Sequence, residues 1–172
     1  MHSVEETIQV AVPVRTAYNQ WTQFGSFPRF MRTVRKVDQI KPALTSWTLG
    51  AGPLRGGFRA EIVEQEPDSH LVWRGLDRHP AHRGEVRFAP TADGGTAVTV
   101  RMEIAPRGTT GLLAGVPGLA GRVVRGELRR FKEYLEGLGE ETGAWRGTIR
   151  GGRLRRGEPE RQESGVPCWP VG

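Results

Sequence analysis

Few side chains in this sequence suit acid–base chemistry, and histidine is the best placed among them. The chain has four histidines, of which His70, His79 and His82 lie near predicted turns. An imidazole exchanges protons near neutral pH without help from its surroundings, so His82 is our candidate catalytic acid or base. The alternative, that a histidine near a turn is only a solvated loop residue, stays open at this stage.

The usual motifs of other catalytic classes are not found. No serine lies in a G-x-S-x-G motif, no histidine or acidic cluster has the spacing of metal ligands, and Gly50-Ala51-Gly52 lacks the Lys-Ser/Thr of a phosphate-binding loop. The single cysteine, Cys168, lies near the end of the chain, which argues against a disulfide framework, a cysteine zinc site and a cysteine nucleophile. We therefore expect no metal and no cofactor.

Length and composition predict one domain followed by a segment outside its core. The 172 residues match one domain of about 100–200 residues, but only 37% are hydrophobic and 24 Gly and 12 Pro are present. No stretch approaches the roughly 18 apolar residues of a membrane span, and the first residues lack the layout of a signal peptide. We expect a cytoplasmic protein without membrane insertion.

The first part of the chain is predicted to form one strand and two short helices. Apolar and polar residues alternate over 4–12, as in a half-buried strand. Pro13 ends this strand, and apolar residues then recur at spacings of three and four, which predicts a helix over 14–24. Ser26 and Pro28 suit the start of a second helix of one or two turns.

Six antiparallel strands are predicted next, because the period changes to two and turn-rich clusters divide the sequence. Their expected spans are 33–41, 43–50, 56–66, 70–76, 82–90 and 96–105. Apolar side chains share one face, which must be covered, and charged side chains share the other. Counted along the same alternation, the polar residues that face inward are His82, Asp77 and Glu64, with Tyr18 and Arg55 reaching in from the rim.

A long helix is predicted to cover the apolar face of the sheet. Residues 109–140 carry apolar side chains at helical spacing on one side and charged side chains on the other, Glu127 among the charged ones. Gly115, Pro117 and Gly118 interrupt the beginning, so a continuous helix is expected from about Leu119. The fold class is therefore α+β, with one domain over 3–142.

This order of elements resembles the helix-grip fold of the SRPBCC (Bet v 1/START-like) superfamily, and most of all its bacterial polyketide cyclase/dehydrase group. The resemblance rests on four stretches in the right order: Val10-Ala11-Val12-Pro13-Val14-Arg15-Thr16-Ala17-Tyr18, then Trp21 and Phe24 leading to Phe27-Pro28-Arg29-Phe30-Met31, then Glu64-Gln65-Glu66-Pro67-Asp68, and Arg130-Phe131-Lys132. It implies a curved seven-stranded antiparallel sheet gripping the long helix, with a cavity for a hydrophobic small molecule between them.

The residues themselves also favour a cavity, since large side chains on the inner face lie beside small residues such as Ala60 and Gly84. The alternative is that these side chains interlock without a void. If the cavity exists, we expect it to be lined by eight residues from the sheet and the helix: Trp47, Phe58, Trp73, Phe88, Met102, Val116, Leu119 and Val123. His82 is then the expected polar contact.

The resemblance implies two functions that share such a cavity. One is an aromatase/cyclase or dehydrase acting on an aromatic or polycyclic molecule, with polyketide synthase components as possible partners. The other is a non-catalytic carrier of a lipid or isoprenoid quinone. In the aromatase/cyclases an arginine commonly projects inward just before the Pro-Asp turn, and this chain has Gln65 there, which weakens the enzymatic interpretation.

The last residues suggest a third, weaker hypothesis. Residues 143–172 are rich in Gly, Arg, Pro and Glu and are predicted to be disordered, apart from Trp145, which can fold back on the domain. Their basic residues, Arg146, Arg150, Arg153, Arg155 and Arg156, resemble segments that contact nucleic acid. Glutamates follow directly, so a merely solvated segment is the more common explanation and a nucleic-acid partner is not favoured.

Overall fold

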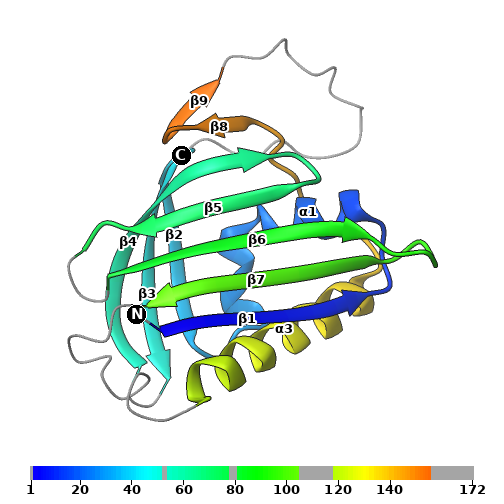
Figure 1. Cartoon of the computed structure of the whole chain (residues 1–172), viewed down its shortest axis with the longest axis horizontal. Helices are drawn as coiled ribbons and strands as arrows, with labels where there is room; N and C mark the ends of the chain where they lie inside the picture. Colours follow the sequence, from blue (N-terminus) through cyan, green and yellow to red (C-terminus); the bar gives the residue numbers. More distant parts are fainter. Residues whose placement is uncertain (1, 52–53, 78–80, 105–117, 156–172) are drawn as a thin grey trace.

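The computed structural model describes residues 2–51, 54–77, 81–104 and 118–155, and Figure 1 shows their arrangement. In chain order the elements are β1 (His2–Val10), α1 (Val14–Trp21), the 3₁₀-helix η1 (Phe24–Arg29), β2 (Val34–Lys41), β3 (Leu44–Ala51), β4 (Leu54–Glu66), β5 (His70–Gly75), β6 (His82–Pro90), β7 (Thr96–Ile104), α3 (Leu119–Leu138), β8 (Thr148–Arg150) and β9 (Arg153–Arg155). The predicted α+β helix-grip fold is confirmed.

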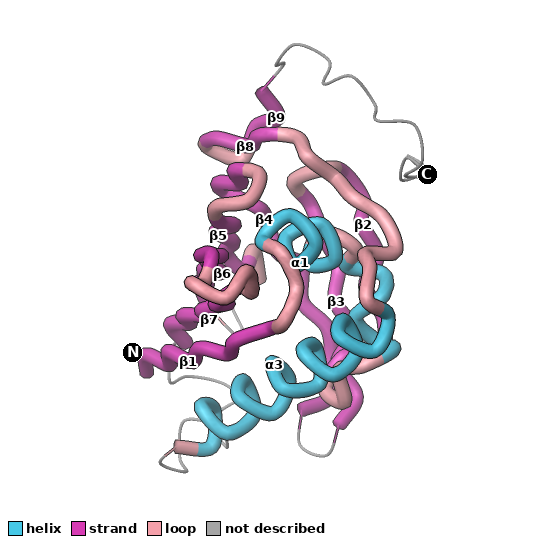
Figure 2. Tube along the Cα trace, turned by 90° about the vertical axis from the view of Figure 1, so that its right-hand side faces the viewer, coloured by secondary structure: helices cyan, strands magenta, loops and turns pink. Residues whose placement is uncertain are grey.

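The strands form one antiparallel sheet in the order β1-β7-β6-β5-β4-β3-β2. Few residues separate the consecutive strands from β2 to β7, and each of these strands pairs with its neighbour in sequence. β1 pairs with β7 along its whole length. In Figure 2 the sheet curls, with β2 and β3 on one side of the helices and β5, β6 and β7 on the other. This curvature creates the interior that α3 covers.

The segment after β1 differs in detail from the predicted pair of helices. The α-helix ends at Trp21, and a 3₁₀-helix with Pro28 inside it follows from Phe24. Because a 3₁₀-helix has three residues per turn, the aromatic residues at spacing three in this segment stay on one side. Phe24, Phe27 and the neighbouring Phe30 are all buried, so this short segment carries an aromatic wall to the interior.

Trp21 lies at the centre of the aromatic core. Its ring meets those of Phe27, Phe88 and Phe131 edge-on, at centroid distances of 5.3, 6.1 and 5.2 Å, a favourable geometry for aromatic pairs. These contacts join α1, η1, β6 and α3 at one end of the sheet. Side chains fill that end of the interior, so the space for a ligand lies beside the first half of α3.

Helix α3 begins at Leu119, as expected, and ends at Leu138; Gly139 follows it with a φ of 73°, which is left-handed and suits glycine. The predicted first part of the helix, 109–117, lies outside the described residues. Among the described residues, no helix is long and apolar enough to span a membrane.

The structure differs from the predicted disorder over residues 143–155. β8 pairs with β4 through Gln65 and Ile149, and Ile149 is fully buried. The Arg146 guanidinium meets the Asp68 carboxylate in two hydrogen bonds of 2.9 and 2.7 Å. The backbone amide of Trp145 donates to Thr22, and the Trp145 ring packs against the core. The disorder predicted for 156–172 lies outside the described residues.

Candidate functional site

A cavity of about 250 Å³ lies between α3, η1 and the concave face of the sheet. Its wall is mostly aromatic and aliphatic, and the polar side chains in it belong to Thr33, Thr45, His82 and Glu127. The other residues that line it are Trp21, Phe24, Phe27, Met31, Val34, Trp47, Leu49, Phe58, Ala60, Ile62, Leu71, Trp73, Val100, Met102, Ile104, Ala120, Val123, Val124 and Leu128. An apolar cavity with a few polar groups is typical of a small-molecule site.

Most of the residues that we expected in the cavity wall lie there. Trp47, Phe58, Trp73, Met102 and Val123 all line the cavity, and so does His82. Two do not: Phe88 packs into the aromatic core against Tyr18 and Trp21, and Leu119 at the start of α3 is not part of the lining. Val116 lies outside the described residues.

The sheet wall is built from pairs of residues that face each other across strands. Trp47 and Phe58 are paired in register on β3 and β4, and their rings stack at 5.9 Å with an interplanar angle of 6°. The His82 ring meets Phe58 edge-on at 4.7 Å. His82 thus lies at the end of an aromatic stack, with its ring on the cavity side as the alternation predicts.

The Trp73 indole depends on a glycine across the strand pair. Trp73 on β5 is in register with Gly84 on β6, and a Cβ atom at position 84 would lie 2.1 Å from the indole Cζ2. Only glycine lets the indole lie this close to the sheet. The expected pairing of large with small residues is therefore present, and it keeps the indole from filling the cavity.

The other polar residues that we placed inward do not line the cavity. A register shift between Ile62 and Glu64 interrupts the alternation in β4, so Glu64 lies outside, with Oε1 2.7 Å from the His70 imidazole. Asp77 accepts the backbone N–H of Arg59 at 2.6 Å, which holds the pKa of that carboxyl below its usual value. The Arg55 side chain lies outside the described residues.

The same register shift turns the Gln65 side chain to the interior, where it forms a hydrogen bond within the core and does not reach the cavity. Its amide donates to the Tyr18 hydroxyl at 2.9 Å, and both side chains are buried. Burial raises the pKa of this hydroxyl well above its usual value, although the Gln65 hydrogen bond and Arg146 act against it. Neither Tyr18 nor Gln65 lines the cavity.

Glu127 is the main feature of the site that the sequence analysis missed. We placed it on the solvated side of the helix, but it is 8% exposed and lines the cavity. Its Oε1 accepts a hydrogen bond from Arg130 at 3.1 Å, whereas Oε2 is buried without a hydrogen-bond partner among the described residues. Burial raises the pKa of this carboxyl, and Arg130 and the nearby amides of Arg32 and Thr33 only partly oppose that effect.

Spacing along the helix could have placed Glu127 correctly. It lies four residues after Val123 and four before Phe131, and residues four apart share a face of an α-helix. We assigned Glu127 to the solvated side because it is charged, although its position places it on the buried side. The aromatic residues of α1 and η1 in the wall, Trp21, Phe24 and Phe27, were likewise missed, although their spacing of three is the signal of a 3₁₀-helix.

A second depression adjoins the cavity on the outer side of Glu127. Thr33, Val123 and Glu127 line both spaces, and Arg32, Arg122, Gly126 and Arg130 complete the outer one. Glu127 therefore stands between an apolar interior and a basic surface. Among the described residues, no cluster of three His, Cys, Asp or Glu side chains is arranged to hold a metal.

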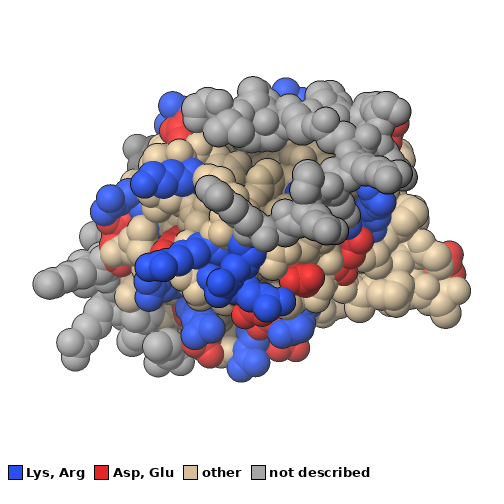
Figure 3. Space-filling view, turned by 90° about the horizontal axis from the view of Figure 1, so that it is seen from above, with Lys and Arg blue, Asp and Glu red and all other residues tan. Residues whose placement is uncertain are grey.

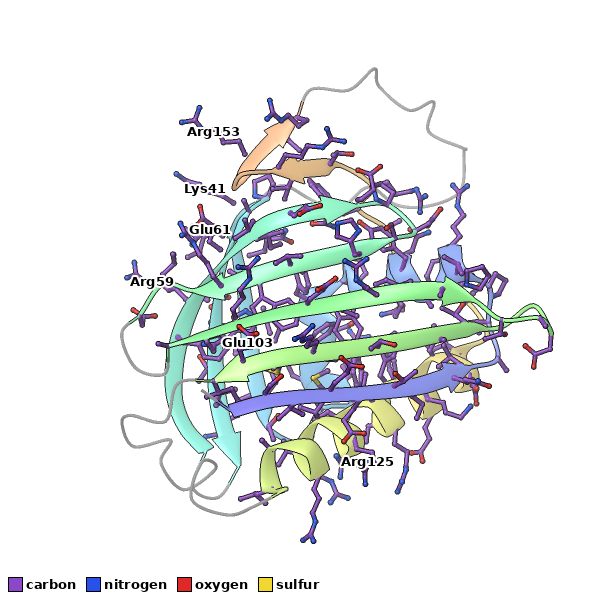
Figure 4. The ribbon with its side chains drawn as sticks, in the orientation of Figure 1. Lys41, Arg59, Glu61, Glu103, Arg125 and Arg153 are labelled. Carbon is purple, nitrogen blue, oxygen red and sulfur yellow. The ribbon has the colours of Figure 1, made fainter. Side chains whose placement is uncertain are left out.

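Basic side chains also gather at the β8–β9 end of the molecule, with acidic ones among them (Figure 3). The labelled Lys41, Arg59 and Arg153 in Figure 4 point away from the interior. Of the arginines that suggested nucleic-acid binding, Arg146 is held by Asp68 and Asn19, Arg150 lies 4.0 Å from Glu66, and Arg156 lies outside the described residues.

Comparison with known proteins gives a consistent family. The family model described as polyketide cyclase / dehydrase and lipid transport matches residues 10–133. An uncharacterized 17.2 kDa protein of Streptomyces lincolnensis, from the melC2-rnhH intergenic region, is 40% identical over 149 residues, covering 87% of this chain and 99% of its own.

Solved structures share the fold. A START superfamily protein from Mycobacterium smegmatis has a TM-score of 0.68 at 14% identity, with 80% of this chain and 99% of that chain covered. The di-domain ARO/CYC BexL from the BE-7585A biosynthetic pathway has a TM-score of 0.62 at 17% identity, with 79% of this chain and 47% of that chain covered.

Proposed function

Because the chain belongs to the polyketide cyclase / dehydrase and lipid transport family, we infer that it binds a hydrophobic aromatic molecule in the cavity beneath α3. In this proposal it acts on the bound molecule as an aromatase/cyclase or dehydrase. The observation that carries the proposal is the cavity itself, whose wall contains the stacked rings of Trp47 and Phe58 from the sheet and Val123 and Val124 from the helix. Flat aromatic walls favour a flat aromatic ligand, because ring pairs add to the burial of apolar area.

The volume limits the size of the ligand. A dry protein cavity of about 150 Å³ holds benzene, so a cavity of about 250 Å³ suits roughly two fused rings. We therefore narrow the expected aromatic or polycyclic ligand to the bicyclic end of that range, or to a larger molecule with part of its length outside.

Ring closure and dehydration need a group that accepts a proton from an acidic carbon and a group that supplies one to the developing oxyanion. His82 lies in the wall and is the proposed acid or base. Once a substrate is identified, His82→Ala should lower kcat by about 100-fold or more. An unchanged kcat would remove this residue from the mechanism and leave the binding proposal intact.

A carrier of a lipid or isoprenoid quinone is the second candidate. It is favoured by Gln65, which stands where the aromatase/cyclases commonly have an inward arginine and is bonded to Tyr18 instead of facing the cavity. A carrier needs only the apolar wall. In the enzymatic proposal the partners are polyketide synthase components in the cytoplasm, whereas a carrier would exchange its ligand with a membrane.

Native mass spectrometry of the purified protein, followed by solvent extraction, tests the shared proposal. We expect a co-purified hydrophobic molecule, or a rise in melting temperature when bicyclic aromatics or quinones are added. A fused-ring phenolic ligand favours the enzyme, and a long isoprenoid or acyl chain favours the carrier. A protein that is repeatedly empty and shifted by none of these molecules contradicts both.

A further inference from the structure

Glu127 has the only carboxylate among the described residues of the cavity wall, and the proposed function leaves it unused. A buried carboxylate oxygen without a hydrogen bond is costly, because the desolvation of the charged group is not compensated. Oε2 is in this position, while Oε1 is held by Arg130. A buried polar atom without a partner calls for an explanation, and at the wall of a cavity a bound ligand group supplies one.

We propose that Glu127 Oε2 is the polar anchor of the ligand, and that the ligand carries a hydroxyl group, phenolic or enolic, which donates a hydrogen bond to it. The proposal rests on the proposed function, since it needs a ligand in the cavity. It extends that function by naming the ligand class: a hydroxylated aromatic molecule of about two rings, with its hydroxyl toward α3 and its rings against the sheet.

The ion pair with Arg130 supports a donor on the ligand over an acceptor. Arg130 donates to Oε1 at 3.1 Å, and its side chain is 29% exposed against 10% for Glu127. This pairing favours the ionised carboxylate, which can only accept hydrogen bonds. Burial keeps the pKa of this carboxyl above its usual value even with Arg130 in place, so binding is measured at neutral pH, where the carboxylate held by Arg130 presents a lone pair to the cavity.

The basic depression outside Glu127 suggests a competing idea, that the ligand places an anionic group among Arg32, Arg122 and Arg130. Glu127 argues against it. An anion entering from the cavity would have to pass the Glu127 carboxylate, a like charge in a poorly solvated place, which is unfavourable. A neutral hydroxyl meets no such barrier, and comparing 2-naphthol with 2-naphthoate distinguishes the two ligands.

The test measures binding of four probes of one ring size by calorimetry at neutral pH: naphthalene, 2-naphthol, 2-methoxynaphthalene and 2-naphthoate. The wild-type protein should bind 2-naphthol about 10-fold or more tightly than 2-methoxynaphthalene, because only the naphthol donates a hydrogen bond to the charged group. Equal affinity for these two probes overturns the proposal, and so does the tightest binding of 2-naphthoate, which would assign the site to the outer arginines.

Variants locate the effect at residue 127. In Glu127→Gln the amide NH₂ replaces Oε2 while the carbonyl keeps the Arg130 contact, so the preference for naphthol over methoxynaphthalene should fall to about twofold or less. Glu133→Gln on the exposed face of α3 is the matched control and should retain the full preference. A preference that survives in Glu127→Gln contradicts the assignment.

These outcomes separate the two proposals. If no probe binds, including naphthalene, the cavity function itself fails. If naphthalene and the others bind without discrimination, the function stands and the Glu127 anchor fails. The comparison of probes on the wild-type protein remains decisive even if Glu127→Gln does not fold.

Discussion

At position 84 the lack of a side chain lets the Trp73 indole lie against the neighbouring strand, 2.1 Å from where a Cβ would be. In Gly84→Ala the new methyl group must push the indole toward the cavity. We expect a loss of about 1–3 kcal/mol in the free energy of unfolding, as for other overpacked cores, and weaker binding of bicyclic aromatics. Urea denaturation and calorimetry measure the two effects.

Gly137→Ala is the matched control for this substitution. Gly137 lies in α3, and a Cβ there would have no neighbour within 4 Å, so alanine should stabilise the helix by about 0.5–1 kcal/mol without changing ligand affinity. If Gly84→Ala behaved in the same way, the indole would not be held against the sheet.

Because of Tyr18, the free energy of unfolding should decrease as the pH becomes alkaline. Burial raises the pKa of its hydroxyl in the folded protein, so its contribution to stability is complete below the unfolded pKa of about 10 and is lost as the pH rises through the folded pKa. Tyr18→Phe removes this dependence but leaves the Gln65 amide without its acceptor, which costs about 1–3 kcal/mol at neutral pH.

The stability difference between wild type and Tyr18→Phe should therefore shrink as the pH rises above about 10. Chemical denaturation at a series of pH values measures it, and Tyr134→Phe, which changes the other tyrosine of the chain, serves as the control. A difference that stays constant with pH would show that Tyr18 ionises as freely when folded as when unfolded.

Individual side chains show where sequence alternation is a safe guide and where it fails. Trp47, Phe58, Trp73 and Met102 line the cavity as expected, because β3, β4 before its register shift, β5 and β7 alternate regularly through these positions. Glu64 was misplaced because the register shift in β4 reverses the facing of every later residue. An extra residue of this kind leaves no mark in the pattern of apolar and polar residues.

At the scale of elements, the C-terminal segment contributes more than its composition suggests. Ile149 is the single fully buried apolar residue of β8, and Leu154 on β9 is 50% exposed. We expect Ile149→Ala to lower the free energy of unfolding by about 2–5 kcal/mol and Leu154→Ala to change it by no more than about 0.5 kcal/mol. Equal, small effects in thermal denaturation would mean that β8 does not hold to β4.

The elements that could be predicted are those long enough to show a period. Six central strands, bounded by Gly, Pro and Asp turns, and the long helix were found with small errors at their ends. β8 and β9 have three residues each, too few for any alternation to register. Their place depends on Asp68 and Gln65, distant residues that no local pattern connects to Arg146 and Ile149.

For the whole molecule, ligand binding should appear as thermal stability. A ligand at 100 times its Kd adds about 2.7 kcal/mol, which for a chain of this length corresponds to a rise of roughly 5–10 °C in Tm. We expect this rise with 2-naphthol, and a smaller one at the same concentration in Gly84→Ala. An unchanged melting temperature at a saturating concentration of ligand would contradict binding in the cavity.

The pairing of β8 with β4 also affects the risk of aggregation while the chain is being synthesised. β3 pairs with residues 54–61 of β4, and β8 covers Glu64 and Gln65 on that same edge. Until residues 148–150 leave the ribosome, this edge offers unpaired backbone groups to any passing strand, the situation that leads to intermolecular sheet addition. A chain that ends at Gly147 would retain all of α3 but keep that edge open permanently, so it should aggregate more than the full chain in light scattering.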